Sequence, residues 1–245
     1  MSPLTITPIG IVHSCFKEKF GIPRQAGLIT DATATLELLP PYNQEDALRG
    51  LEGFSHLWLL FIFHQNLRDS WKPTVRPPRL GGNQRMGVFA TRSSFRPNPI
   101  GMSAVELAGI SKNSGKLLLH LKGVDLLDGT PIIDIKPYLP YADQIPAATS
   151  GFAPDTPEAT LAVEFSASAL LACQMLERAG YANLRHLIHQ ILQSDPRPAY
   201  YTATTKKTEF ILRLFDLAIT WRVVTPDKAI VSIIQPESDA TLAVE

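Results

Sequence analysis

Residues 102–124 read MSAVELAGISKNSGKLLLHLKGV, and this stretch is the most informative about the fold. Two apolar runs, Met102–Ile110 and Lys116–Val124, flank the polar turn Lys112–Gly115. Asn, Ser and Gly tolerate the backbone conformations that a tight turn between antiparallel strands requires. The stretch therefore predicts a β-hairpin with its turn at Asn113–Gly115.

Further short segments of the N-terminal part have the composition of strands and are separated by turns. The most apolar of them, Ser55–His64, is nearly continuous in aromatic and aliphatic residues, which predicts a strand buried on both faces. The other expected strands are Leu4–His13, Ala32–Leu39, Met86–Thr91 and Ile132–Ile135. Many short strands with few helices between them predict a mainly β protein, in which an antiparallel sheet closes into a barrel.

A segment rich in Pro, Ala and Thr divides the chain. It spans 142–157, and we expect a linker at about 146–157. The division predicts two domains, namely a β-barrel at 1–145 and a small α+β domain at 158–245.

The C-terminal part has a mixed pattern of helix and strand. Apolar residues at helical spacing predict helices at Ser166–Ala179 and Asn183–Gln193, and Ser166 and Gly180 are the expected caps of the first helix. Alternating apolar and polar residues predict a strand at Leu217–Val223, with a hairpin turn before it at 215–216. A third strand is expected at Ala229–Ile234, so this part predicts an α+β domain.

Charge and cysteine content narrow the class of protein. The 245 residues carry 23 Lys and Arg against 23 Asp and Glu, and a net charge of zero argues weakly against a nucleic-acid binder. Cys15 and Cys173 are far apart and match neither a disulfide framework nor a zinc site. The first residues lack a signal-peptide pattern, and the longest apolar run, Leu57–Phe63, is too short to span a membrane. We therefore expect a cytoplasmic protein with no bound metal and no membrane contact.

The cationic residues are concentrated in one segment, which we call the basic segment. Seven lie between residues 68 and 96, where Asp69 is the only acid: Arg68, Lys72, Arg76, Arg79, Arg85, Arg92 and Arg96. Arginine in loops rich in Pro and Gly suits phosphate contacts, because the guanidinium group matches phosphate oxygens. The pattern is equally typical of a solvated loop, so charge alone does not decide between the two.

The stretch TRSSFRPNPIG at 91–101 contains two candidate site residues. Pro97 and Pro99 exclude a helix and stiffen the loop that carries Arg92 and Arg96. A stiff loop with two arginines suits a clamp for a carboxylate or a phosphate. The commoner alternative is a structural turn with one ion pair.

The remaining candidates for chemistry are acids and histidines. Asp125 and Asp128 follow an expected strand and suit ribose hydroxyls, an ammonium group or a proton, although ordinary turn residues are the commoner case. His186 and His189 share a predicted helix without a third ligand nearby, so a metal site is not expected. No GxGxxG motif is present, which argues against a Rossmann-type nucleotide site.

Five blocks of sequence together resemble the TrmO (TsaA-like) family. They are FGIPRQAGLIT (20–30), LEGFSHLWLLFIFH (51–64), ATRSSFRPNPIGMS (90–103), GVDLLDGTPIIDIKPYLPY (123–141) and DPRPAY (195–200). The resemblance covers most of the chain and implies a homodimeric β-barrel enzyme that uses S-adenosylmethionine (SAM). It also implies N6-methylation of threonylcarbamoyladenosine, next to the anticodon of a tRNA that reads threonine codons.

The resemblance further implies which residues form the site. The family's cofactor pocket corresponds here to Pro23, Arg24, Gln25, His64, Gln65, Arg92, Met102, Asp125, Leu126, Leu127 and Asp128. Ala26 and Ser94 stand where the family pattern has proline, which affects the rigidity of the loops more than the chemistry.

The chemistry of the implied reaction suggests roles for a few of these residues. The target nitrogen must lose a proton, and Asp125 and Asp128 are candidate bases, although contacts with ribose hydroxyls fit them equally well. The carboxylate of the threonyl group needs a cation, for which Arg96, Lys136 and Arg197 are candidates. Two other functions remain open: a non-catalytic SAM-responsive RNA-binding module and an N-methyltransferase for a small molecule.

Overall fold

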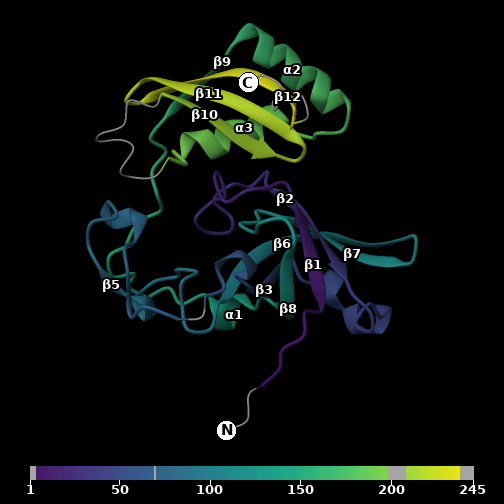
Figure 1. Cartoon of the computed structure of the whole chain (residues 1–245). Helices are drawn as coiled ribbons and strands as arrows, with labels where there is room; N and C mark the ends of the chain where they lie inside the picture. Colours follow the sequence, from purple (N-terminus) through teal and green to yellow (C-terminus); the bar gives the residue numbers. More distant parts are fainter. Residues whose placement is uncertain (1–3, 69, 198–207, 238–245) are drawn as a thin grey trace.

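The structure, a computed structural model, describes residues 4–68, 70–197 and 208–237 (Figure 1). Six strands form a closed barrel in the order β1-β2-β7-β6-β3-β8. Every neighbouring pair is antiparallel. The strands are β1 (Gly10–Ser14), β2 (Thr33–Leu38), β3 (His56–Ile62), β6 (Ile100–Asn113), β7 (Lys116–Lys122) and β8 (Thr130–Pro137). The predicted fold class, an antiparallel barrel followed by an α+β part, is confirmed.

The β6–β7 hairpin lies where the sequence predicts it. Asn113 pairs with Lys116, which leaves a two-residue turn of Ser114 and Gly115. Both turn residues have positive φ, 49° and 80°, as a type I′ turn requires. This turn matches the right-handed twist of the two strands and so fixes their register.

Three of the predicted strands differ from the structure, and two of them belong to the barrel. β3 is buried on one face only, because a barrel strand alternates between the interior, where Leu57 and Leu59 lie, and an outer face. Outside, Trp58 is half-buried and packs against Tyr138, with ring centroids 5.7 Å apart. Leu4–His13 is a strand only from Gly10 onward, where the register with β2 and β8 begins.

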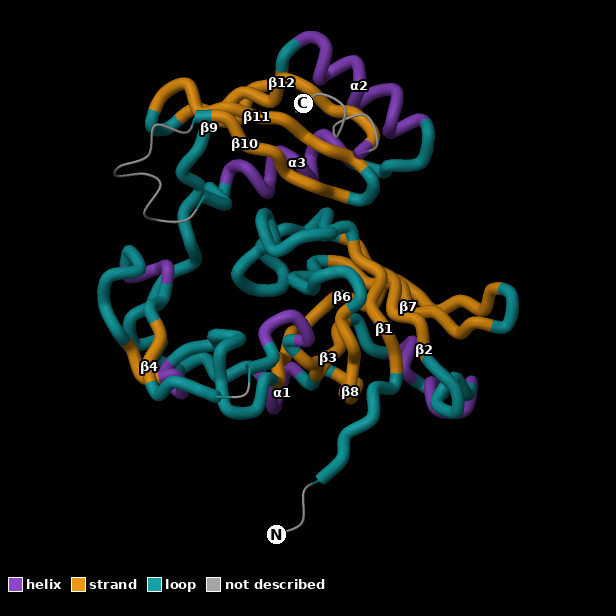
Figure 2. Tube along the Cα trace, in the orientation of Figure 1, coloured by secondary structure: helices purple, strands orange, loops and turns teal. Residues whose placement is uncertain are grey.

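The expected strand Met86–Thr91 is also shorter than predicted. It is a strand only at β5 (Met86–Gly87), which pairs with β4 (Thr74–Val75), and a one-turn 3₁₀ helix follows at Val88–Ala90. Pro77 and Pro78 follow β4 closely and lack the N–H groups that a longer ladder needs. Loops therefore form most of this segment at the side of the barrel (Figure 2).

The C-terminal part contains a four-stranded sheet of order β10-β11-β12-β9. Its strands are β9 (Ala162–Phe165), β10 (Glu209–Leu214), β11 (Leu217–Thr225) and β12 (Lys228–Pro236), and β9 runs parallel to β12. The helices are α2 (Ala167–Arg178) and α3 (Leu184–Gln193), while a short α1 (Pro140–Asp143) follows the barrel. The predicted N-cap is confirmed, since Ser166 Oγ accepts a hydrogen bond from Ala169 N at 3.1 Å, whereas the C-cap is Ala179, one residue before the predicted Gly180.

The segment between β1 and β2 joins the barrel to the second sheet. Phe16 forms an isolated bridge with Leu214, and Phe20 stacks on Phe210 with ring centroids 6.4 Å apart. Gly21 has φ +88°, and a Cβ atom there would lie 2.3 Å from Leu212 Cδ1. Glycine is therefore required for this close approach, which sets the position of the residues that follow it.

None of the helices within the described ranges is long and apolar enough to cross a membrane.

Candidate functional site

A cavity of about 450 Å³ opens at the barrel between four separate segments. They are the loop after Gly21, the end of β3, the loop leading into β6 and the loop between β7 and β8. Among its lining residues are Pro23, Arg24, Gln25, His64, Gln65, Arg92, Met102, Asp125, Leu126 and Leu127. The structure thus brings together every residue of the expected cofactor pocket except Asp128.

Asp125 is the most unusual group in this cavity. Its Oδ1 atom is buried and has no hydrogen-bond partner among the described residues. Burial raises the pKa of the Asp125 carboxyl, while the Ser103 hydroxyl, the amides of Asp125 and Ala26, and the charge of Arg92 act in the opposite direction. A buried acceptor without a partner is costly unless a ligand supplies a donor, which makes Asp125 a candidate contact for a ligand.

The loops around the cavity are cross-linked by polar side chains. Arg92 donates to Gln25 Oε1, and Lys19 Nζ donates to Asn66 Oδ1 at 2.7 Å. Asn66 Nδ2 in turn donates to Ser94 Oγ at 2.7 Å, a contact that proline at position 94 cannot make. These bonds connect three segments that are distant in sequence and hold the loops around the cavity together.

One wall of the cavity is aromatic. Phe61 and Phe63 meet edge to face with ring centroids 5.1 Å apart. A Cβ atom on Gly101 would lie 2.4 Å from the Phe61 ring, so the ring has room only beside glycine. The cavity therefore combines an apolar wall with a carboxylate and three guanidinium groups, those of Arg24, Arg92 and Arg96, a combination typical of sites for nucleoside-like ligands.

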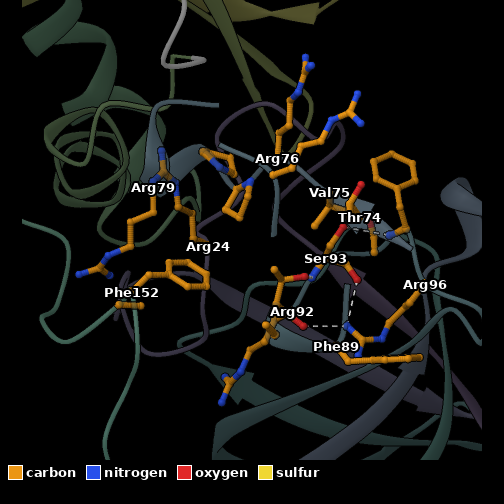
Figure 3. Close-up of a pocket in the computed structure, with 18 of the residues that line it drawn as sticks. Arg24, Thr74, Val75, Arg76, Arg79, Phe89, Arg92, Ser93, Arg96 and Phe152 are labelled. Carbon is orange, nitrogen blue, oxygen red and sulfur yellow. Dashed lines mark hydrogen bonds between the residues drawn. The ribbon is translucent and has the colours of Figure 1, made fainter. Parts of the chain in front are cut away.

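A second cavity, of about 2100 Å³, adjoins the first, and we call it the basic groove. Figure 3 shows Arg24, Arg76, Arg79, Arg92 and Arg96 around it, together with Phe89 and Phe152. All seven cationic residues of the basic segment line it, and Asp155 is the one acid among its described lining residues. Asp69 lies outside the described residues. The seven cations are therefore close together in space as well as in sequence, and they make the surface of this groove strongly positive.

The two cavities share part of their walls. Seven residues line both of them: Arg24, Gln25, Asn66, Thr91, Arg92, Ser94 and Arg96. A ligand in the smaller cavity and a larger one in the basic groove would therefore meet at this wall.

Residues 149–157, within the segment expected to be a linker, also line the basic groove. Arg79 donates to the carbonyl oxygen of Asp155, and Phe152 lies on the wall. The sequence carries no signal for this role, because composition does not show where a loop runs. It gives no distinct signal for Ser103, Asn66 and Lys19 either, although Ser103 and Asn66 flank predicted site residues in the chain.

Three of the candidate site residues lie elsewhere. Asp128 accepts from Ser14 N at 2.9 Å and pairs with Lys17 at 2.8 Å, so its carboxylate closes the turn after β7 rather than the cavity. Lys136 pairs with Asp134 at 2.7 Å on β8. Arg197 is held by both oxygens of Asp195, at 2.7 Å each, and its side chain is only 9% exposed. Of the block 195–200, residues 198–200 lie outside the described residues.

Arg96 does line both cavities, but part of its guanidinium group is already used. Its NH1 atom donates to the carbonyl oxygens of Thr91 and Ser93 at 2.9 and 3.3 Å (Figure 3). Arg96 therefore stabilises the loop of Pro97 and Pro99 through this one nitrogen.

The histidines of α3 have no metal-binding arrangement. His186 Nδ1 pairs with Asp31 Oδ2, which connects α3 to the segment between β1 and β2. In the part of the chain that the structure describes, no three His, Cys, Asp or Glu side chains gather around a possible ion.

The fold and the site define a class: two-domain β-barrel proteins with a polar, cationic ligand site at the barrel. Family models agree, since the tRNA-methyltransferase O N-terminal domain matches residues 11–144 and the TrmO C-terminal domain matches residues 158–237. The chain belongs to the TrmO family.

Individual relatives cover nearly the whole chain. The tRNA (adenine(37)-N6)-methyltransferase of Escherichia coli K12 is 50% identical over 223 residues, which are 91% of this chain and 94% of the relative. A Pseudomonas aeruginosa protein assigned as an S-adenosylmethionine-dependent methyltransferase is 49% identical over the same shares. The crystal structure of TrmO from Pseudomonas aeruginosa superimposes with a TM-score of 0.78 at 41% identity, covering 96% of this chain and 98% of that one.

Proposed function

We propose that this protein is a SAM-dependent methyltransferase that modifies N6 of an adenosine in tRNA. The observation that carries the proposal is the wall shared by a cofactor-sized cavity and a large cationic groove. The relatives named as tRNA (adenine(37)-N6)-methyltransferases support the same reaction.

The residues of the smaller cavity suit the chemical groups of SAM. The cofactor supplies a methyl group activated by a sulfonium centre. The unpartnered Asp125 Oδ1 suits its ribose hydroxyls or its ammonium group, and Arg92 and Arg24 suit its carboxylate. Phe61 and Phe63 provide an apolar wall for the rest. Asp125 therefore acts in our proposal as a binding group, and Asp128 is not part of the site.

The finer proposal concerns the target, threonylcarbamoyladenosine 3′ to the anticodon in threonine tRNA. Its threonyl group adds a carboxylate, for which the sequence offers three candidate cations, Arg96, Lys136 and Arg197. Arg96 is the candidate that lines both cavities, whereas Lys136 and Arg197 are paired with acids of their own chain. We therefore assign the carboxylate contact to Arg96.

The test is nucleoside mass spectrometry after incubation of the protein with isotopically labelled SAM and bulk tRNA. We expect one labelled nucleoside whose fragments place the methyl group on N6 of a modified adenosine. A label in a different nucleoside would contradict the proposed target. SAM binding with no transfer to any RNA would instead indicate a non-catalytic SAM-responsive module.

A homodimer and a cytoplasmic location are also part of the proposal. The apolar side chains of Leu171 and Met175 are exposed on α2, which supports a partner surface on this helix. Analytical ultracentrifugation of the purified protein tests the dimer, and a single species of monomer mass would contradict it.

A further inference from the structure

Two large aromatic side chains of the basic groove are left in solvent. Trp71 is 51% exposed and Phe89 is 75% exposed. Their ring centroids lie 6.3 Å apart with an interplanar angle of 33°, and both rings line the groove. Exposed apolar surface of this size among charged residues marks an interaction site.

The main chain around the pair explains why the rings point outward. Val88 is buried, and its N–H donates to the carbonyl oxygen of Pro73 at 2.9 Å. This bond fixes the one-turn helix Val88–Ala90 against the loop that carries Trp71. With Val88 anchored inside, the neighbouring Phe89 side chain extends to the solvent side. The exposure of Phe89 thus follows from a well-anchored backbone.

A third aromatic residue of the groove differs from this pair. Phe95 carries the Arg68 guanidinium over its ring at 4.2 Å from the centroid, so one of its faces is already covered. Trp71 and Phe89 are tilted toward each other and expose more of their surface. They are therefore the rings of the groove that are most accessible to a planar ligand.

The surroundings indicate what that ligand is. Eight cationic side chains line the groove with the aromatic pair, and phosphates are their natural partners: Arg24, Arg68, Lys72, Arg76, Arg79, Arg85, Arg92 and Arg96. Aromatic rings beside a cationic path are the usual means of binding unpaired nucleotides, because every base has a face that can stack. A duplex offers no free base face to such a pair.

We propose that Trp71 and Phe89 form a stacking platform for an unpaired base that neighbours the target nucleotide in the RNA. This inference rests on the proposed function, in which RNA is the substrate. The stacked base is not the target itself, because Trp71 and Phe89 line only the basic groove and not the smaller cavity. Phe89 lies three residues before Arg92, which lines both, so the platform is next to the shared wall.

The test uses an anticodon stem-loop RNA and the full-length protein. Trp71→Ala combined with Phe89→Ala should raise the dissociation constant of the stem-loop by roughly 10- to 100-fold, the range expected for losing base stacking. SAM affinity should stay at the wild-type value. The single variant Trp71→Phe should retain most of the wild-type affinity for the stem-loop, because a phenylalanine ring can also stack on a base. Tyr141→Ala is the matched control, since Tyr141 is 87% exposed and does not line the groove.

Two further measurements separate stacking from charge. An abasic residue beside the target should weaken binding to the wild type but not to the double variant. The salt dependence of binding should not change in the double variant, because no counterion release is lost. A double variant with wild-type affinity, or an abasic penalty that persists in it, would overturn the platform. Failure of the wild type to bind any tRNA would instead overturn the proposed function.

Discussion

Among single residues, Asp125 and Asp128 show how similar side chains acquire different roles. They lie three positions apart in the same loop, yet Asp128 pairs with Lys17 and accepts from the Ser14 amide, whereas Asp125 has a buried oxygen without a partner among the described residues. A buried carboxyl oxygen without a hydrogen-bond partner lowers the stability of the free protein. The buried oxygen of Asp125 is the kind of feature that lowers folding stability at a ligand-binding site.

Asp125→Asn should change the pH dependence of stability. The folded-state pKa of Asp125 is raised above its ordinary value of 3.8, so the folded state holds this proton over a pH range in which the unfolded state has lost it. The contribution of Asp125 to the unfolding free energy of the wild type therefore falls as pH rises from below 3.8 through the folded-state pKa. Asparagine does not titrate, so the unfolding free energy of the variant should lack this fall. Urea unfolding at several pH values measures it. A difference between the two proteins that does not vary with pH would contradict the raised pKa.

Arg92→Ala should weaken SAM binding by about 1.5–3 kcal/mol, the range for a hydrogen bond to a charged group. Arg92 lines both cavities and also donates to Gln25, so its loss removes a ligand contact and a loop contact. Isothermal titration calorimetry measures the change. Arg49→Ala is the control, because Arg49 pairs with Asp46 away from both cavities. Unchanged affinity in a folded Arg92 variant would exclude this residue from the site.

Among the elements, the segment between β1 and β2 connects the two parts of the molecule. Its glycines differ in what surrounds them: Gly21 lies against Leu212, while a Cβ atom added to Gly27, also with positive φ, would have nothing within 4 Å. The pair therefore separates the cost of backbone strain from the cost of a steric clash.

Gly27→Ala should lower the unfolding free energy by about 1–2 kcal/mol, the cost of a left-handed conformation for a residue with a Cβ atom. Gly21→Ala should lower it further, because its Cβ would lie 2.3 Å from Leu212 Cδ1, and should also weaken SAM binding by displacing Pro23 and Arg24. Chemical denaturation and calorimetry measure both effects. Equal unfolding free energies of the two variants would show that the Leu212 side chain moves away from the added Cβ atom without an energetic penalty.

The cations of the basic segment that line only the basic groove should bind tRNA and not SAM. Replacing Arg76, Arg79 and Arg85 by alanine should raise the tRNA dissociation constant and reduce the slope of its logarithm against the logarithm of salt concentration by about 2 to 3, since fewer counterions are released. These residues line the basic groove but not the smaller cavity, so SAM affinity should not change.

The matched control replaces three cations outside the groove, Arg49, Lys112 and Lys116. The last two lie at the β6–β7 hairpin, on the opposite side of the barrel from β4 and β5 (Figures 1 and 2). The control should retain the wild-type slope. A wild-type slope in the groove variant as well would show that its arginines form only a solvated loop.

At the scale of the whole molecule, the proposed function predicts that substrates are selected at the wall shared by the two cavities. A site that holds a cation for the threonyl carboxylate rejects plain adenosine, because the cation would lose its partner. We therefore expect tRNA with the threonylcarbamoyl group to be methylated roughly 100-fold faster or more than the same unmodified transcript. Rates of methyl transfer from labelled SAM to the two RNAs measure this. Equal rates would indicate a different target.

Substitutions at two arginines test which one provides that selectivity. Arg96→Ala should reduce the preference, since Arg96 lines both cavities. Arg197→Ala should leave it intact, because Arg197 is already held in a bidentate pair with Asp195. Loss of preference in the Arg197 variant alone would reverse this assignment.

The sequence by itself determined the features that depend on neighbouring residues. The turn of Ser114 and Gly115, the cap at Ser166 and the alternation in β11 all follow from local conformational preferences and from periodicity. The resemblance of the five blocks also identified the family and most of the residues around the smaller cavity. Each of these signals is contained in a few neighbouring residues, so it can be recognised in the sequence without knowledge of the tertiary structure.

Only the tertiary structure decided which of these residues face one another. Closure of the barrel places β1 beside β8 and β2 beside β7, and it thereby directs Asp128 to Ser14 while Asp125 stays in the cavity. It also brings residues 149–157 to the basic groove and leaves Trp71 and Phe89 exposed there. Such placements depend on contacts between distant parts of the chain, and local pattern carries no information about them.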